Sequence, residues 1–172
     1  MCPEIAVFSR RAFSWGDDVK RIHALIVDSW TSSAPRNTFH IGDLHWRLRR
    51  QPECDPVRDI HLWEAKSGAL AGFAWHEPPS SGDIFSRQTS YRTDLENEML
   101  CWLESRRLQD RGEGPCALTT GALEGDHQRT RILRSRGYSR SSVGYPHHLI
   151  PLDGPLPNQD LPSGFRVLTM AD

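Results

Sequence analysis

The sequence lacks the features that mark several large classes of protein. No apolar run approaches the roughly 18 residues that a membrane-spanning helix needs, and the N-terminal residues show no basic-then-apolar signal pattern. The four cysteines are scattered and form no C-x-x-C pair, the spacing typical of zinc ribbons and redox motifs. With 21 basic and 22 acidic residues, no global field favours nucleic acid or an anionic membrane. These absences favour a soluble, cytoplasmic, globular protein.

Lysine is nearly absent as well, since only Lys20 and Lys66 are lysines among the 21 basic residues. The codon usage of a GC-rich genome would produce this bias. A need for bidentate arginine contacts with phosphate or carboxylate groups is the second explanation. The hydrophobic fraction of 37% in 172 residues is below average usage but is enough for the core of one domain.

Common catalytic and metal-binding motifs are absent too. The sequence contains no P-loop, no G-x-S-x-G elbow, no G-x-G-x-x-G loop and no H-E-x-x-H helix. Eight histidines are present, but none has a ligand spacing with a paired cysteine or carboxylate. The adjacent His147 and His148 would point to opposite faces of a strand. We therefore expect no metal site.

Hydrophobic periodicity predicts an alternation of strands and helices. The expected strands are 5–8, 60–65, 70–75, 83–88 and 116–120, with one or two closing strands in 143–150. The expected helices are 18–30, a shorter one that begins at Asp43, 94–108 and 126–136. Gly137 stands directly after the last helix, where glycine commonly ends helices.

The composition changes at Pro151. Four prolines and two glycines interrupt residues 151–164, which cannot hold regular structure and are predicted to form a linker. After the linker, residues 165–172 begin a strand and then stop, much as the chain itself begins. We therefore expect one domain over 1–150, a linker over 151–164 and the start of a truncated second domain over 165–172.

Three short segments carry a resemblance to a known family. They are Ala71-Gly72-Phe73-Ala74 in a hairpin strand, Tyr91-Arg92 ahead of the long helix, and residues 131–138, which close a helix with Gly-Tyr. In this order they resemble the Gcn5-related N-acetyltransferase (GNAT) family over residues 4–150. The resemblance implies an α/β (α+β) acyl-CoA N-acyltransferase fold with a mixed, mostly antiparallel sheet and helices on both faces. It also implies acetyl transfer from acetyl-CoA to the amine of a small molecule or a protein.

The resemblance also assigns site residues. In the family, the loop before the long helix holds the coenzyme pyrophosphate. The matching positions, implied to bind the cofactor, are Gln88, Arg92, Thr93, Asp94, Leu95 and Asn97. A general base in this family is often a glutamate near the preceding strand. Glu77, beside His76 at the hairpin end, is the catalytic candidate.

The loop departs from the family pattern at its glycines. Three glycines are expected at positions 93, 95 and 97, because backbone N–H groups must approach the pyrophosphate closely; none is present. Asp94, Glu96 and Glu98 instead bring negative charge to a helix N-terminus, which suits a helix cap, with Asp94 in that role, better than an anion site. Leu133 stands where many members have a tyrosine that acts as general acid, and it has no proton to donate.

Three hypotheses follow. In the first, the chain is the degenerate N-terminal half of a tandem GNAT protein, whose partner is a second GNAT domain of the same chain. In the second, it is an active single-domain acetyltransferase in which Arg92 and the N–H groups of residues 93–97 hold the pyrophosphate. In the third, it is a non-catalytic binding or scaffolding module that meets its partner through five clustered arginines, Arg129, Arg131, Arg134, Arg136 and Arg140.

Overall fold

We analysed a computed structural model, which describes residues 8–32, 39–50, 54–110, 116–144, 163–164 and 166. The chain divides into one compact unit up to Ser139 and a second unit from Arg140 onward. The predicted linker and the restart after it lie outside the described residues, apart from positions 163, 164 and 166. Within the described ranges, no helix is both long and apolar enough to cross a membrane.

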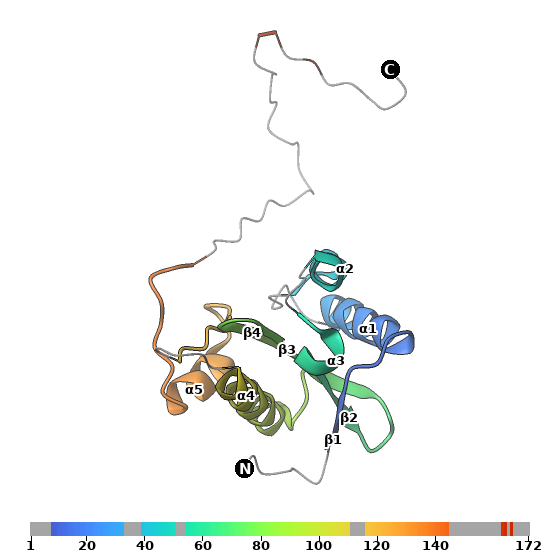
Figure 1. The fold of residues 1–172 in the computed structure, drawn as a ribbon, viewed down its shortest axis with the longest axis vertical. Coiled ribbons are helices and arrows are strands. Elements are labelled where there is room, and N and C mark those ends of the chain that lie inside the picture. Colours follow the sequence, from blue (N-terminus) through green and yellow to red (C-terminus); the bar gives the residue numbers. More distant parts are fainter. Residues whose placement is uncertain are drawn as a thin grey trace. The chain divides into compact units, whose positions relative to one another are not determined.

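A four-stranded antiparallel sheet forms the centre of the first unit (Figure 1). Its strands lie side by side in chain order: β1 (Phe8–Ala12), β2 (Ile60–Ala65), β3 (Leu70–Glu77) and β4 (Ser81–Ser86). Gly68, with a φ of 79°, permits the tight turn between β2 and β3. The hairpin that the sequence predicts is thereby confirmed, with β3 two residues longer than expected.

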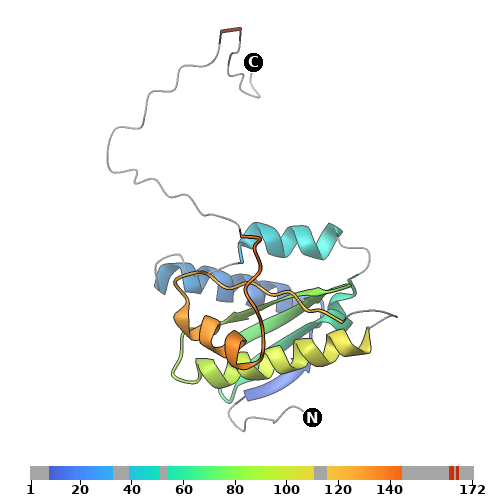
Figure 2. The same ribbon diagram turned by 90° about the vertical axis from the view of Figure 1, so that its left-hand side faces the viewer.

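Helices cover both faces of this sheet, as Figures 1 and 2 show. The helices are α1 (Asp17–Ser32), α2 (Ile41–Arg50), α3 (Pro56–Asp59), α4 (Arg92–Gln109) and α5 (His127–Ser135). Residues of α1 and α2 share one hydrophobic core with the sheet, and residues of α4 and α5 share the other. The expected mixed α/β architecture with helices on both faces is confirmed.

The two faces of β3 differ in side-chain size. Phe73 and Trp75 are fully buried in the core shared with α1 and α2, whereas Ala74 faces the core shared with α4. Gly72 is required by the close approach of α4, because a Cβ atom there would lie 2.2 Å from Met99 Cε and 2.5 Å from the Phe85 carbonyl oxygen. Small residues in this strand therefore allow α4 to pack directly on the sheet.

Three strand predictions differ from the structure. The expected strand 83–88 is β4, which begins and ends two residues earlier, at Ser81–Ser86. Within the described residues, the first strand runs from Phe8 to Ala12, so the expected range 5–8 ends four residues too early. In the predicted strand 116–120, only Thr119 pairs, through a single parallel bridge to Ser81. Its N–H donates to the Ser80 carbonyl at 2.8 Å, and its carbonyl accepts from Gly82 N–H at 2.9 Å. One bridge does not make a strand.

Two other differences concern short elements. The predicted closing strand over 143–150 does not appear at 143–144, and its remaining residues lie outside the described ranges. The short helix α3 was not predicted. It begins at Pro56, and the Asp55 side chain caps it by accepting from Val57 N–H at 3.1 Å.

We expect Gly72→Ala to destabilise the protein by about 2 kcal/mol, because the added methyl group would force the β3 and β4 backbones or α4 apart. Urea unfolding measures this loss. Gly125→Ala is the matched control, because a Cβ atom there would have no neighbour within 4 Å and the φ of this glycine is not positive. Equal stability of the two variants would contradict the close packing of α4 on β3.

A second prediction concerns acid stability. His61 packs on Trp102 with 4.5 Å between ring centroids, and burial, assisted by the positive charge of Arg10, lowers its pKa to about 4. Between that value and the ordinary pKa near 6.5, the unfolded chain binds a proton that the folded chain does not, so acidification costs stability.

In His61→Phe this cost disappears. Urea unfolding at several pH values between 7 and 4.5 should show wild type losing stability relative to the variant below about pH 6.5, by at most about 1.4 kcal/mol per pH unit. Parallel pH profiles of the two proteins would show that His61 titrates normally in the folded state.

Candidate functional site

The turn from β4 into α4 is the position that the family resemblance assigns to cofactor binding. The strand pairing continues one residue beyond β4, since Arg87 N–H donates to the Ala71 carbonyl at 2.8 Å. Tyr91 is the N-cap residue of α4, and its side chain makes no capping hydrogen bond. The interpretation of Asp94 as the cap was therefore wrong: Asp94 is an exposed residue of the first turn, where its charge acts only through the helix dipole.

A fully buried carboxylate lies behind this turn. Glu96, with 0% exposure, accepts hydrogen bonds at Oε1 from Ser86 Oγ, Arg92 Nε and Arg129 Nη2, each at 2.7 Å. Its Oε2 accepts from Arg129 Nε at 3.3 Å. One carboxylate thus joins the end of β4, the first turn of α4 and the first turn of α5.

The ionisation of Glu96 follows from these partners. Burial by itself would raise the pKa of the carboxyl group, because it penalises the charged form. The positive charge and hydrogen bonds of Arg129, the Ser86 hydroxyl and the charge of Arg92 act in the opposite direction and prevail. The pKa of Glu96 is consequently below its ordinary value, and the group is a carboxylate at neutral pH.

Arg92 also joins the beginnings of α4 and α5. Besides Glu96, its guanidinium pairs with Asp126, the N-cap residue of α5, and its Nη1 lies 3.4 Å from Gln88 Oε1. A second link runs alongside, since Gln128 Nε2 donates to Thr93 Oγ1 at 2.6 Å. The two helix N-termini are therefore held together by side chains of the chain itself.

The charges of this cluster cancel. Arg92 and Arg129 contribute two positive charges, and Glu96 and Asp126 contribute two negative ones. Arg92 is only 6% exposed, and binding a pyrophosphate would require it to leave both carboxylates. Breaking one partner out of a buried ion pair costs several kcal/mol. The residues present do not fit the pyrophosphate of acetyl-CoA.

The other predicted cofactor residues lie in this turn or in the first two turns of α4, and they differ in exposure. Gln88, Thr93 and Asp94 are exposed, and the Leu95 side chain is fully buried in the core below α4. Asn97 is half-buried; its Nδ2 donates to the Thr93 carbonyl at 3.0 Å. Their assignment to the cofactor remains a prediction.

Glu77, the predicted catalytic residue, lies elsewhere. It is the last residue of β3 and pairs with Ser81 at the start of β4, so about 17 Å of strand separates it from Ser86. Its Oε1 is 3.0 Å from Arg47 Nη1, which also donates to Asp83 Oδ2 at 2.7 Å. The structure therefore does not bring Glu77 together with the β4–α4 turn, and its catalytic role remains a prediction.

The five clustered arginines differ in their surroundings. Arg129 is buried against Glu96, and Arg136 makes two hydrogen bonds to Glu104, at 2.9 and 2.5 Å. Arg131 and Arg134 are exposed. Arg129 and Arg136 are therefore held by carboxylates of the chain itself, and binding of a partner through this segment stays a prediction. Leu133, in the position of the general acid, packs against the core of α4.

Sequence reasoning missed the partners of the buried carboxylate. Glu96 was interpreted as surplus negative charge at the helix end, whereas two arginines neutralise it. The i,i+4 spacing of Arg92 and Glu96 was a signal for one of these pairs. Nothing in the sequence indicates that Arg129, 33 residues further along, closes the cluster.

Comparisons with known proteins address the fold. No protein-family model matches the chain, and neither does any curated protein. Among solved structures, a GCN5-related N-acetyltransferase from Sphaerobacter thermophilus matches with a TM-score of 0.58 and 16% identity over 77% of this chain. Ard1 from Thermoplasma volcanium matches with a TM-score of 0.54 and 14% identity, over 80% of this chain and 86% of that protein. A predicted acetyltransferase with acetyl-CoA from Clostridium acetobutylicum matches with a TM-score of 0.54 and 11% identity, over 82% of this chain and 96% of that protein.

These likenesses establish the fold: the chain has the fold of the GNAT acyltransferases. The resemblance seen in the sequence and the observed structure share three features: the order of the four strands, the helices on both faces and the long helix after β4. The chain spans 43% of the length of the Sphaerobacter protein.

The buried cluster makes a stability prediction. Glu96→Gln should destabilise the fold by about 3 kcal/mol or more, because it leaves Arg92 and Arg129 as buried charges with Asp126 as the remaining carboxylate of the cluster. Asp94→Asn, an exposed change in the same helix turn, should alter stability by less than about 1 kcal/mol. Chemical unfolding of both variants is the measurement. Equal losses would mean that the Glu96 ion pairs contribute little.

Proposed function

We propose that this chain is the degenerate N-terminal half of a tandem GNAT N-acetyltransferase, which transfers an acetyl group from acetyl-CoA to the amine of a small molecule or protein. In this proposal the acetyl transfer takes place in a second GNAT domain of the same protein. The present domain would shape the substrate site or support the catalytic half.

One observation carries the proposal: the arginine that the family would offer to the pyrophosphate is bound internally. Arg92 is buried between Glu96 and Asp126, and the three glycines that would let the phosphates approach the backbone are absent. A GNAT-fold domain that does not bind the coenzyme has no need of glycines in this loop, but it still needs its hydrophobic core in order to fold. We expect an intact core together with an altered loop in a duplicated domain that no longer carries out catalysis.

Two further features support the proposal. Leu133 packs against the core where a proton donor is expected. The chain covers less than half of the N-acetyltransferase from Sphaerobacter thermophilus, so the GNAT fold also occurs within a chain considerably longer than this one.

Calorimetric titration of acetyl-CoA into the purified chain tests the degenerate site. We expect no heat of binding at millimolar ligand, because the cluster offers no net positive charge and no open backbone. Binding of micromolar affinity, about −8 kcal/mol, would overturn this part and favour an active single-domain acetyltransferase.

The tandem part has its own test. The full-length gene product should contain a second GNAT domain after this one, and it should bind acetyl-CoA and acetylate an amine in an amine screen. A full-length product without a further GNAT domain would overturn the tandem proposal, whatever the result of the calorimetry.

A further inference from the structure

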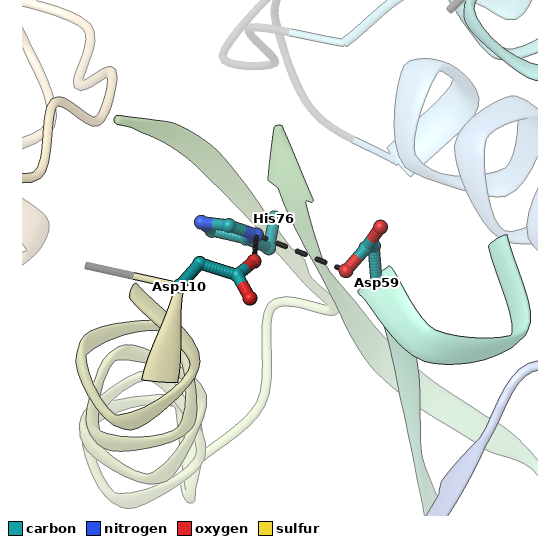
Figure 3. A group of neighbouring side chains, drawn as sticks. All are labelled: Asp59, His76 and Asp110. Carbon is teal, nitrogen blue, oxygen red and sulfur yellow. Dashed lines mark ion pairs between the residues drawn. The ribbon is translucent and has the colours of Figure 1, made fainter. Parts of the chain in front are cut away.

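Three side chains of types that commonly bind metal ions meet near the C-terminal end of α4, away from the β4–α4 turn (Figure 3). Asp59 is the last residue of α3, His76 belongs to β3, and Asp110 is the C-cap residue of α4. His76 Nδ1 lies 3.7 Å from Asp110 Oδ2 and 3.9 Å from Asp59 Oδ1. Within the described part of the chain, one ligand atom from each residue falls within 4.8 Å of the others.

The imidazole of His76 is the unexplained member of this group. The residue is 0% exposed, and neither of its ring nitrogens has a hydrogen-bond partner. Leaving buried polar atoms unpaired costs about 1–3 kcal/mol each, so such atoms call for an explanation. Figure 3 shows Nδ1 directed between the two carboxylates. A cation between them would satisfy this nitrogen.

We propose that Asp59, His76 and Asp110 form a binding site for a divalent transition metal, with Zn²⁺ the best match. Zinc takes imidazole nitrogen at about 2.0–2.1 Å and carboxylate oxygen at about 2.0–2.2 Å. In the tetrahedral geometry that zinc prefers, ligand atoms around one ion therefore lie about 3.4 Å apart. The distances of 3.7 and 3.9 Å from His76 Nδ1 are a few tenths of an ångström longer than this, and the two carboxylates also have to move closer together around the ion. Asp110 is partly exposed, which gives the ion a route from solvent.

Arg106 occupies the position next to this site. It donates to Asp59 Oδ1 from Nε at 3.2 Å and Nη2 at 3.1 Å, and to Asp110 Oδ1 from Nη1 at 2.8 Å. Arg58 also donates to Asp59, from Nε to Oδ1 at 2.9 Å and from Nη2 to Oδ2 at 2.7 Å. The two arginines together balance both negative charges and keep the carboxylates facing each other. Metal binding at Asp59 Oδ1 replaces the contacts of both arginines with this oxygen, while the bond of Arg106 to Asp110 Oδ1 is retained. This competition predicts micromolar rather than tighter affinity.

The site departs from the sequence-based expectation of no metal, because its ligands are separated by 17 and 34 residues and follow no motif. A bound ion would join α3, β3 and the end of α4. The inference is independent of the proposed acetyltransferase function, since the cluster belongs to neither the β4–α4 turn nor α5.

Thermal unfolding of chelator-treated protein with added ZnCl₂ tests the proposal. Zinc that binds only the folded state raises the Tm, and we expect a rise of several degrees that EDTA reverses. His76→Phe should fold as well as wild type, because no hydrogen bond is lost, but its Tm should not respond to zinc. Asp110→Asn should weaken the response at least tenfold in zinc concentration.

Two control variants remove other zinc-binding groups. His45→Ala deletes an exposed imidazole on α2, and Cys116→Ser deletes an exposed thiol; both should respond to zinc like wild type. Equilibrium dialysis should give one zinc ion per chain for wild type and none for His76→Phe. A wild-type Tm that zinc leaves unchanged, or a full response in His76→Phe, would overturn the site.

Discussion

A single buried carboxylate holds together the end of β4 and the beginnings of α4 and α5. Glu96 has no contact with solvent and is kept ionised by Arg92 and Arg129. A charge in that position is tolerated only when it is fully paired, so both arginines have to point inward. The beginnings of α4 and α5 and the end of β4 take their relative positions from this requirement.

The same requirement explains why the loop ahead of α4 needs no glycine. In a site that binds pyrophosphate at a helix N-terminus, backbone N–H groups have to be reached closely by the ligand. Here Arg92 and Asp126 provide the charges at that place, and neither a glycine nor a ligand is needed to complete it. The domain has the architecture of a GNAT fold, and the charged side chains at this turn pair with one another.

Local patterns predicted the helices and the hairpin well. The apolar stripe of α1 and the alternation of β2 and β3 are properties of neighbouring residues, so they can be recognised without the fold. The edge segment around Thr119 was predicted less well, because a strand also depends on its partner, and β4 offers this segment only one bridge.

The candidate site was harder to predict, and for a related reason. The sequence located the β4–α4 turn through Tyr91 and Arg92, but it did not show that Arg92 turns inward. That orientation depends on Asp126, 34 residues away. In the same way, no spacing rule connects His76 with Asp59 and Asp110. Contacts between distant segments, rather than local propensity, decide what each charged side chain does.

The most direct test of this account is the ionisation of Glu96 in the folded protein. A pH titration of its side-chain carboxyl ¹³C resonance by NMR, assigned through the signal lost in Glu96→Gln, measures the pKa. The account predicts a pKa well below the ordinary glutamate value of about 4.3, because Arg129 and Arg92 outweigh the effect of burial. An ordinary or raised pKa would show that the arginines are not held on Glu96, and the internally satisfied site would have to be abandoned.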